Sequence, residues 1–199
     1  MNKFWNDRYA EPEYAYGTKP NEFLKVELAK LKPGKILFVS EGEGRNAVYA
    51  ALKGWDVYAF DLSRVGKQKA LELAKSKNVE IHYQLADAAW VKYPKINFDV
   101  IVFIYAQFPE IVRKRVHEEA IKWLRKQGRI IVEGFTIDQL KHNSFGPKDA
   151  GMLYTPEIIA DDFAGMVTEK LTVTSTMLDE GKYHQGRAEI LRFVGRKGK

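Results

Sequence analysis

Short apolar runs alternate with longer amphipathic stretches over the first two thirds of the chain. Five runs have the length of strands: Ile36 to Val39, Val57 to Phe60, Val79 to Leu85, Phe98 to Tyr105 and Arg129 to Phe135. The fourth is apolar apart from Asp99, which is typical of a central strand buried on both faces. Strands that alternate with helices in this way predict an α/β sheet with right-handed crossovers.

The stretches between these runs carry helix signals. Helices are predicted for Glu22 to Lys32, Ala47 to Leu52, Ser63 to Ser76, Pro109 to Leu124 and Thr155 to Phe163. In the first of them, Leu24, Leu28 and Leu31 recur at helical spacing. Asn21 precedes this helix and is a residue type favoured as an N-terminal cap. The predicted layers are therefore helices packed against a sheet.

The last third of the chain breaks the alternation. Residues 136–156 contain Gly146, Pro147 and Gly151 and are long for a connection, so we expect a flap over one edge of the sheet. Two further strands, Leu171 to Leu178 and Ala188 to Val194, are predicted to form a hairpin. We expect one domain over residues 1–199, with the aromatic segment 1–20 as a prelude to it.

Composition limits the classes of function. The 199 residues include no cysteine, which excludes thiolate metal sites and cysteine nucleophiles, and no two histidines have the spacing of metal ligands. The net charge of +6 arises mostly from bases interleaved with acids, which argues against a nucleic-acid partner. No apolar run is long enough to span a bilayer, and we expect a cytoplasmic monomer or homodimer.

The clearest chemical signal lies between residues 36 and 61. A strand leads into Ser-Glu-Gly-Glu-Gly, a helix follows, and a second strand ends at Asp61, 19 positions after Gly42. This is close to the offset of about 20 residues at which an acid can bind ribose hydroxyls in a βαβ unit. Glu41 and Glu43 would repel a pyrophosphate, whereas the sulfonium and ammonium of S-adenosylmethionine tolerate them. A nicotinamide dehydrogenase is thus disfavoured but stays open.

Four features together indicate a family: the loop Gly42-Glu43-Gly44-Arg45-Asn46-Ala47, Asp87-Ala88, Phe98-Asp99 and the late hairpin. With them, the chain resembles class I S-adenosylmethionine-dependent methyltransferases. The chain looks most like the small tellurite-resistance-type and thiopurine-methyltransferase-like members. The resemblance implies a Rossmann-like α/β/α sandwich. Its seven-stranded, mostly parallel sheet has the order 3-2-1-4-5-7-6, with strand 7 antiparallel.

The resemblance also implies which residues bind S-adenosylmethionine. The glycine loop would meet the methionine moiety and ribose, Asp61 the ribose hydroxyls, and Asp87 and Ala88 the adenine. Part of segment 1–20, with its Trp-x-x-Arg-Tyr and Tyr-Gly patterns, would fold over the cofactor. The implied cofactor-binding residues are Arg8, Tyr16, Ser40, Glu41, Gly42, Gly44, Asn46, Asp61, Leu62, Asp87, Ala88 and Ile104.

Two positions depart from the family pattern. Phe38 stands where the family usually has an acid, and Ser40 where it has the first glycine of the loop. These changes would weaken the contact with the amino-acid end of the cofactor, and we hypothesise that Glu41 compensates. They also keep open a non-catalytic S-adenosylmethionine-binding protein.

The methyl acceptor is expected to be a small molecule, a thiol or a chalcogen or metalloid species, with RNA as an alternative. Ligands of open α/β sheets bind at the carboxyl ends of the strands. His184 in the hairpin loop and Tyr105 after the fourth strand are therefore the predicted catalytic residues. Arg113, Lys148 and Arg187 could attract an anionic acceptor or be solvated.

His117 lies in mid-helix among charges, and we expect it on the surface. No metal ion is required by the predicted chemistry.

Overall fold

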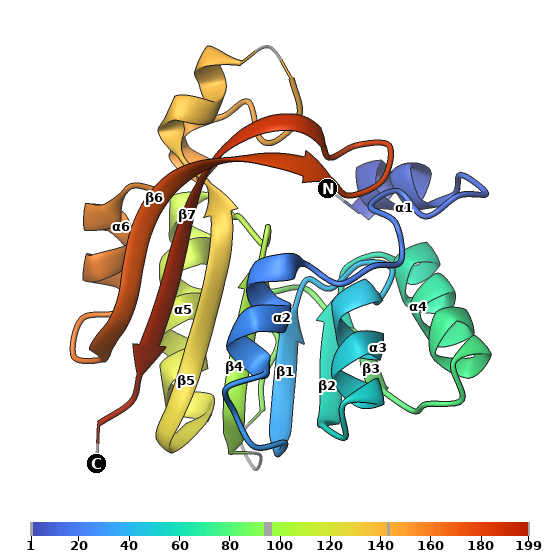
Figure 1. Cartoon of the computed structure of the whole chain (residues 1–199), viewed down its shortest axis with the longest axis horizontal. Helices are drawn as coiled ribbons and strands as arrows, with labels where there is room; N and C mark the ends of the chain where they lie inside the picture. Colours follow the sequence, from blue (N-terminus) through green and yellow to red (C-terminus); the bar gives the residue numbers. More distant parts are fainter. Residues whose placement is uncertain (1, 94–96, 143, 199) are drawn as a thin grey trace.

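The computed structural model describes residues 2–93, 97–142 and 144–198. They contain one seven-stranded sheet of order β3-β2-β1-β4-β5-β7-β6 (Figure 1). The strands are β1 (Lys35–Val39), β2 (Asp56–Asp61), β3 (His82–Leu85), β4 (Phe98–Ile104), β5 (Leu124–Phe135), β6 (Val167–Asp179) and β7 (Gln185–Arg196). Strand β7 runs antiparallel to both of its neighbours, and the pairs among β1 to β5 are parallel. The predicted strand order and orientation are confirmed.

Two apolar clusters hold helices against opposite faces of this sheet. The helices are α1 (Asn2–Tyr9), α2 (Glu22–Leu28), α3 (Arg45–Leu52), α4 (Arg64–Ser76), α5 (Glu110–Trp123) and α6 (Pro156–Asp162). Alternate residues of a strand point to opposite faces. Accordingly, Ile36 and Phe38 pack with α2, α3 and α4, whereas Leu37 and Val39 pack with α5 and α6. This arrangement is the three-layer sandwich.

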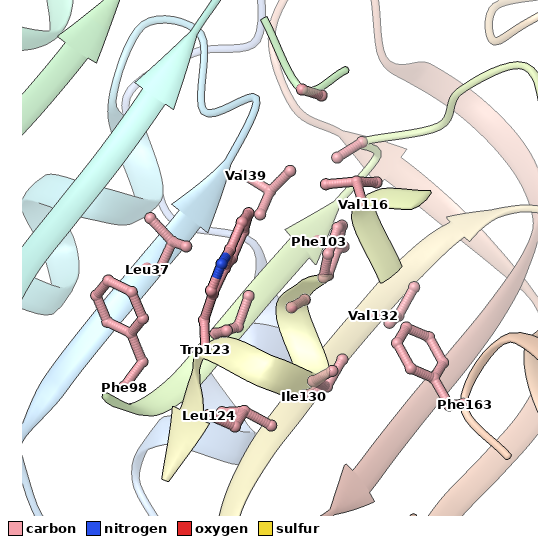
Figure 2. Packing of buried hydrophobic residues seen from close by; sticks show 14 of the residues in the cluster. Leu37, Val39, Phe98, Phe103, Val116, Trp123, Leu124, Ile130, Val132 and Phe163 are labelled. Carbon is pink, nitrogen blue, oxygen red and sulfur yellow. The ribbon is translucent and has the colours of Figure 1, made fainter. Parts of the chain in front are cut away.

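The face covered by α5 shows how the central strands are buried. Trp123 of α5 lies among Leu37, Phe98 and Leu124, while Phe103 and Val132 line the same layer (Figure 2). Phe103 and Leu124 are at most 1% exposed. Burial of side chains of this size contributes roughly 1.5–3 kcal/mol each, so the sheet is a rigid base for the loops at its edge.

Several element boundaries differ from the prediction. Helix α1 was not predicted, because its polar sequence shows no apolar stripe. Strand β5 begins at Leu124, which pairs with Phe98 before a shift in register. Within residues 136–156, apart from residue 143, the chain forms the 3-10 helices η1 (Ile137–Lys141) and η2 (Ala150–Met152).

The long β6–β7 hairpin curves over the carboxyl edge of the parallel strands and reaches the side of α1 (Figure 1). At its tip, the Tyr183 N–H donates to the Ala15 carbonyl at 3.3 Å. The amino-terminal segment and the hairpin, far apart in sequence, thus meet above the sheet edge. Over the ranges that the structure describes, no helix combines the length and apolar character needed to cross a membrane.

Candidate functional site

The glycine loop after β1 makes a succession of left-handed turns. Ser40, Gly42 and Gly44 have φ angles of 51°, 63° and 86°. A Cβ atom on Gly42 would lie 2.6 Å from the Tyr9 hydroxyl, and one on Gly44 would lie 2.6 Å from the Cβ of Ala70. The two glycines are therefore required by close packing as well as by backbone conformation. Ser40 occupies the same region without being glycine, which is a local strain typical of functional loops.

Asp61 at the end of β2 faces this loop. Its Oδ2 accepts from the Gly42 N–H at 3.0 Å and its Oδ1 from the Ser63 N–H at 2.7 Å. Burial raises the pKa of Asp61 to about 6, although these N–H groups oppose the rise. Each carboxylate oxygen keeps a lone pair beyond its backbone partner. Asp61 therefore has acceptor capacity left, and its contact with ribose hydroxyls remains a prediction.

Glu41 binds the start of helix α3. Its Oε1 accepts from the N–H groups of Asn46 and Ala47 at 2.9 and 2.7 Å. Burial raises the pKa of Glu41 to about 7, and the backbone donors and Arg45 only partly offset this. The Asn46 side chain accepts from the Asn21 N–H at 2.9 Å. The predicted contacts of Glu41 and Asn46 with the cofactor remain predictions.

Glu43 faces away from that helix start and binds the amino-terminal segment. Its Oε2 accepts from the Ala15 N–H at 2.7 Å, and its Oε1 lies 2.5 Å from Lys69 Nζ. The side chain is buried and paired. Of the two loop acids, Glu43 therefore has a structural partner of its own. The argument that acids in the loop disfavour a pyrophosphate and are tolerated by a sulfonium cofactor therefore rests on Glu41.

The region predicted to bind adenine lies after β3. Asp87 Oδ1 accepts from the Ala89 N–H at 2.8 Å, which leaves Oδ2 available. Within the described residues, the Ala88 N–H donates to no acceptor. Leu62 and Ile104 are half-buried at the ends of β2 and β4. A carboxylate oxygen, a free N–H and apolar walls along one edge fit an adenosine group.

Phe38, at the position of the family acid, is 1% exposed and packs in the apolar core under α2, α3 and α4. It cannot contact a ligand above the sheet edge. A buried core residue therefore stands at the position of the family acid.

The region predicted to face the methyl acceptor, called the acceptor side below, is formed by aromatic rings around His184. The ring centroids of Tyr16, Tyr105, Phe135 and Phe145 lie 4.5, 4.6, 5.3 and 5.5 Å from that of His184. Tyr105 has a left-handed φ of 54°, which turns the chain sharply at the end of β4. The fold thus brings the two predicted catalytic residues together, with Tyr16 of the amino-terminal segment beside them.

A carboxylate orients the imidazole. His184 Nδ1 lies 3.4 Å from Glu180 Oε2, which also forms an ion pair with Arg45 at 2.8 Å. Burial would raise the pKa of Glu180, but the hydrogen bond with His184 and the charge of Arg45 outweigh it and hold the pKa at about 2. Burial lowers the pKa of His184, more than Glu180 raises it. The ring is therefore neutral at pH 7, and Nε2 is the nitrogen left for an acceptor.

Arg8 links the amino-terminal segment to the hairpin. It donates to the Tyr16 hydroxyl at 3.2 Å, and its guanidinium lies 3.7 Å from the centre of the Tyr183 ring. Tyr183 also hydrogen-bonds Glu11, which forms an ion pair with Lys182 at 2.6 Å. Arg8 and Tyr16, both predicted cofactor residues, are thus held where the segment meets the hairpin.

The structure corrects the expectations for His117 and Arg113, whereas Lys148 and Arg187 are exposed, as one of the two alternatives for them expected. His117 is fully buried, and its Nδ1 lies 2.8 Å from Asp162 Oδ2, so its predicted surface position is wrong. Arg113 is neither solvated nor near the acceptor side, because it is buried against the same carboxylate at 2.7 Å. Lys148 donates to the Ser144 carbonyl. Arg187 pairs with Glu189 on an exposed strand surface.

Sequence reasoning did not find four residues of the site: Glu180, Arg45, Phe145 and, beyond its role as a cap, Asn21. Each lies in a different element, and only their tertiary positions bring them together. The one sequence signal for Glu180 was its place four residues before His184 in the hairpin loop.

Comparisons with known proteins agree with this geometry. A family model described as a methyltransferase domain matches residues 36–128. A phosphoethanolamine N-methyltransferase from Triticum aestivum is 30% identical over 113 residues, which cover 55% of this chain and 22% of that protein. The match therefore spans only about a fifth of that relative's length.

Solved structures with the same fold extend over the whole chain. N-methyltransferase NodS from Bradyrhizobium japonicum WM9 in complex with S-adenosyl-l-homocysteine has a TM-score of 0.78 at 11% identity, covering 100% of this chain and 98% of that one. TehB from Haemophilus influenzae has a TM-score of 0.72 at 14% identity, covering 98% and 66%. At these identities the likeness shows the fold. The methyltransferase-domain match over residues 36–128 and the observed strand order agree with the resemblance to class I S-adenosylmethionine-dependent methyltransferases, and the chain has the fold of these enzymes.

Proposed function

We propose that the chain methylates a small neutral acceptor, with a thiol or related chalcogen nucleophile, and that His184 accepts the acceptor's proton. The observation that carries this proposal is the buried imidazole of His184, set among aromatic rings with Nδ1 on Glu180. When bound, S-adenosylmethionine supplies a methyl group already activated by its sulfonium. The residues of the chain then need to position the acceptor, exclude water and take one proton.

The proton balance is simple for a thiol. The S–H bond breaks and its proton goes to Nε2 of His184, while the sulfur would gain the methyl group as the methyl–sulfonium bond breaks and S-adenosylhomocysteine leaves. A thiol has an ordinary pKa of about 8.5, so a nearby neutral imidazole is a suitable base. Glu180 would stabilise the imidazolium through Nδ1. Burial and the nearby Glu133 charge raise the pKa of the Tyr105 hydroxyl well above the ordinary value, so the hydroxyl stays protonated. Tyr105 would therefore orient the acceptor.

The walls support a small, uncharged acceptor. Both buried carboxylates already have cations: Glu180 pairs with Arg45, and Glu133 pairs with Arg192 at 2.6 Å. The aromatic rings favour a weakly hydrated, polarisable atom over a strongly hydrated ion. The hairpin and amino-terminal segment contact each other above the sheet edge, which restricts the size of an acceptor.

Cofactor binding completes the proposal. Asp61 would accept from the ribose, Asp87 and Ala88 would meet the adenine, and Glu41 would face the ammonium of the methionine moiety. These roles are supported by the donors and acceptors that the loop and the β3 end leave available.

The test is transfer of a labelled methyl group from S-adenosylmethionine to a panel of small thiols, selenite, tellurite, amines and RNA. We expect transfer to a neutral thiol and not to the selenite or tellurite anions, and a loss of about 10²–10⁴-fold in the His184→Gln variant, the usual contribution of a general base. His82→Gln is the matched control, since His82 is exposed on β3. Cofactor binding without transfer to any class would instead support a non-catalytic binder, and transfer to RNA alone would support the alternative acceptor.

A further inference from the structure

A buried polar network connects the two residues that the proposed function places beside the acceptor. The Tyr105 hydroxyl donates to Glu133 Oε1 at 3.1 Å, and His184 Nδ1 lies 3.4 Å from Glu180 Oε2. Between these carboxylates lies Asn21, whose Nδ2 donates to Glu133 Oε1 at 2.6 Å and to Glu180 Oε1 at 3.1 Å. The continuous order is therefore Tyr105, Glu133, Asn21, Glu180, His184.

Asn21 is held firmly enough to set the positions of both acids. It is 2% exposed, its Oδ1 caps helix α2 by accepting from the Leu24 N–H at 3.0 Å, and its backbone N–H donates to Asn46 Oδ1. With Oδ1 committed to the helix, the amide nitrogen is fixed toward the two carboxylates, where both of its protons are used. The cap and the bridge thus use opposite ends of one amide.

Electrostatics explains why a neutral amide lies between the two carboxylates. Glu133 is 0% exposed, and burying a charge is costly unless it is paired and hydrogen-bonded. The Asn21 amide gives each carboxylate a donor without adding a charge between them. Replacing the amide by a carboxylate would place three acids together.

We infer that Asn21 is a positioning residue for methyl transfer, whose amide bridges Glu133 and Glu180 and so orients Tyr105 and His184 together. The inference rests on the proposed function for its link to catalysis. Asn21 directly follows the amino-terminal segment. The bridge therefore also couples the position of that segment to the geometry of the acceptor side.

Two variants separate the bridge from the cap. Serine and aspartate are cap residues about as good as asparagine, so Asn21→Ser and Asn21→Asp keep the α2 cap but lose the two N–H donors. The neighbouring Glu22→Gln, at an exposed position, is the control. The pKa of His184, followed by NMR of ¹⁵N-labelled imidazole, provides a readout that does not depend on turnover.

Several titratable and charged groups surround His184 on the elements packed against it. They are Glu180 and Tyr183 of the hairpin, Arg45 of α3, Arg8 and Tyr16 of the amino-terminal segment, Tyr105 directly after β4 and Glu133 of β5. Loss of the amide leaves the Glu180 charge less compensated, and a new carboxylate adds to it. Both changes favour the imidazolium.

We expect the His184 pKa to rise from parent to Asn21→Ser to Asn21→Asp, with no change in Glu22→Gln. For Asn21→Ser we expect kcat to fall about tenfold, equivalent to about 1.4 kcal/mol, with KM for the cofactor within about twofold. An unchanged His184 pKa in folded Asn21→Ser would overturn the inference, even if the melting temperature fell. If Asn21→Asp does not fold, Asn21→Ser decides alone. Absence of methyl transfer in the parent would overturn the proposed function, while the titration would still test the bridge.

Discussion

The Glu43 carboxylate accepts a hydrogen bond from the Ala15 N–H at 2.7 Å and so fixes the amino-terminal segment to the glycine loop. An acid of the glycine loop therefore holds the segment that meets the hairpin above the sheet edge. The loop and the segment are therefore one structural unit, and the segment's position depends on a charge within the loop.

Glu43→Gln should loosen this attachment. The amide can still accept from Ala15, but Lys69 Nζ loses its ion-pair partner at a largely buried position. Breaking a buried pair costs up to roughly 3–5 kcal/mol, so we expect faster amide exchange in residues 10–18 and earlier proteolysis there. Glu22→Gln, which breaks an exposed ion pair with Lys25, is the control. Equal exchange rates in parent and Glu43→Gln would show that the segment is held by other contacts.

Cofactor affinity should depend on the ionisation of Asp61. Its pKa is about 6, and ribose hydroxyls donate best to the charged carboxylate. Binding would release the proton, so affinity for S-adenosylhomocysteine should rise from pH 5 toward pH 7, by at most about tenfold per pH unit for one proton, and then level off. Calorimetry in two buffers of different ionisation enthalpy measures the proton release.

Asp61→Asn should remove the Asp61 part of this pH dependence and weaken binding by roughly 1.5–3 kcal/mol, the range for a hydrogen bond to a charged group. Asp56→Asn, at the exposed start of the same strand, should leave both unchanged. A parent affinity that is flat between pH 5 and 7 would contradict the assignment.

Glu41 should make the free protein less stable as pH rises. Because its pKa is raised to about 7 in the folded state from the ordinary 4.5, the folded state binds more protons between these values. Stability due to this group therefore falls from about pH 4.5 to pH 7 and is constant above. Glu41→Gln keeps an oxygen for the Asn46 and Ala47 N–H groups but carries no charge. We therefore expect the difference in the free energy of unfolding between variant and parent to move in favour of the variant, by on the order of 2 kcal/mol, from pH 4.5 to pH 8.

Urea unfolding of both proteins at the two pH values measures this difference. The same variant tests the hypothesis that Glu41 replaces the family acid: it should bind S-adenosylmethionine more weakly at pH 8. Equal affinity would sink that hypothesis without affecting the stability prediction.

Asp162→Ala should be strongly destabilising. It would leave Arg113, 4% exposed, without its carboxylate and would remove the partner of His117 Nδ1. The expected loss is about 3–5 kcal/mol in the free energy of unfolding by urea. Asp161→Ala, at the exposed neighbour, should stay within about 0.5 kcal/mol. A loss below about 1 kcal/mol in Asp162→Ala would show that the buried cation finds another partner.

The sheet was predictable because strand length, apolar runs and helix punctuation all act locally. Phe98 to Ile104 is apolar apart from Asp99 and forms the central β4, and Ser63 caps α4 as predicted. The late hairpin was also predicted from local signals, whereas the full strand order and the antiparallel orientation of strand 7 came from the family resemblance.

Helix α5 shows where local reasoning fails. Charges flank His117, which suggested an exposed position, yet Arg113, His117 and Ala120 share the buried side at spacings of four and three. Arg113 and His117 are buried because Asp162, 45 residues beyond His117, pairs with both. The spacing of Arg113, His117 and Ala120 was the available sequence signal for a buried helix face. The acid that pairs with Arg113 and His117, Asp162, lies on another helix.

The same limit applies to the site. His184 and Tyr105 could be chosen from the strand-end rule, since both follow or join strands at one edge. Arg45 and Asn21 could not, because each is connected to them only through tertiary contacts across α2, α3 and the hairpin, and Glu180 offered only its place four residues before His184. A residue whose side chain bridges two distant acids leaves no periodic trace in the sequence.

The most direct test of the account is a crystal structure of the protein with S-adenosylhomocysteine and a thiol acceptor. The account predicts the ribose hydroxyls on the Asp61 carboxylate, the adenine beside Asp87 and Ala88, and the thiol sulfur within hydrogen-bond reach of His184 Nε2. Adenosine bound away from Asp61, or an acceptor remote from His184, would contradict it.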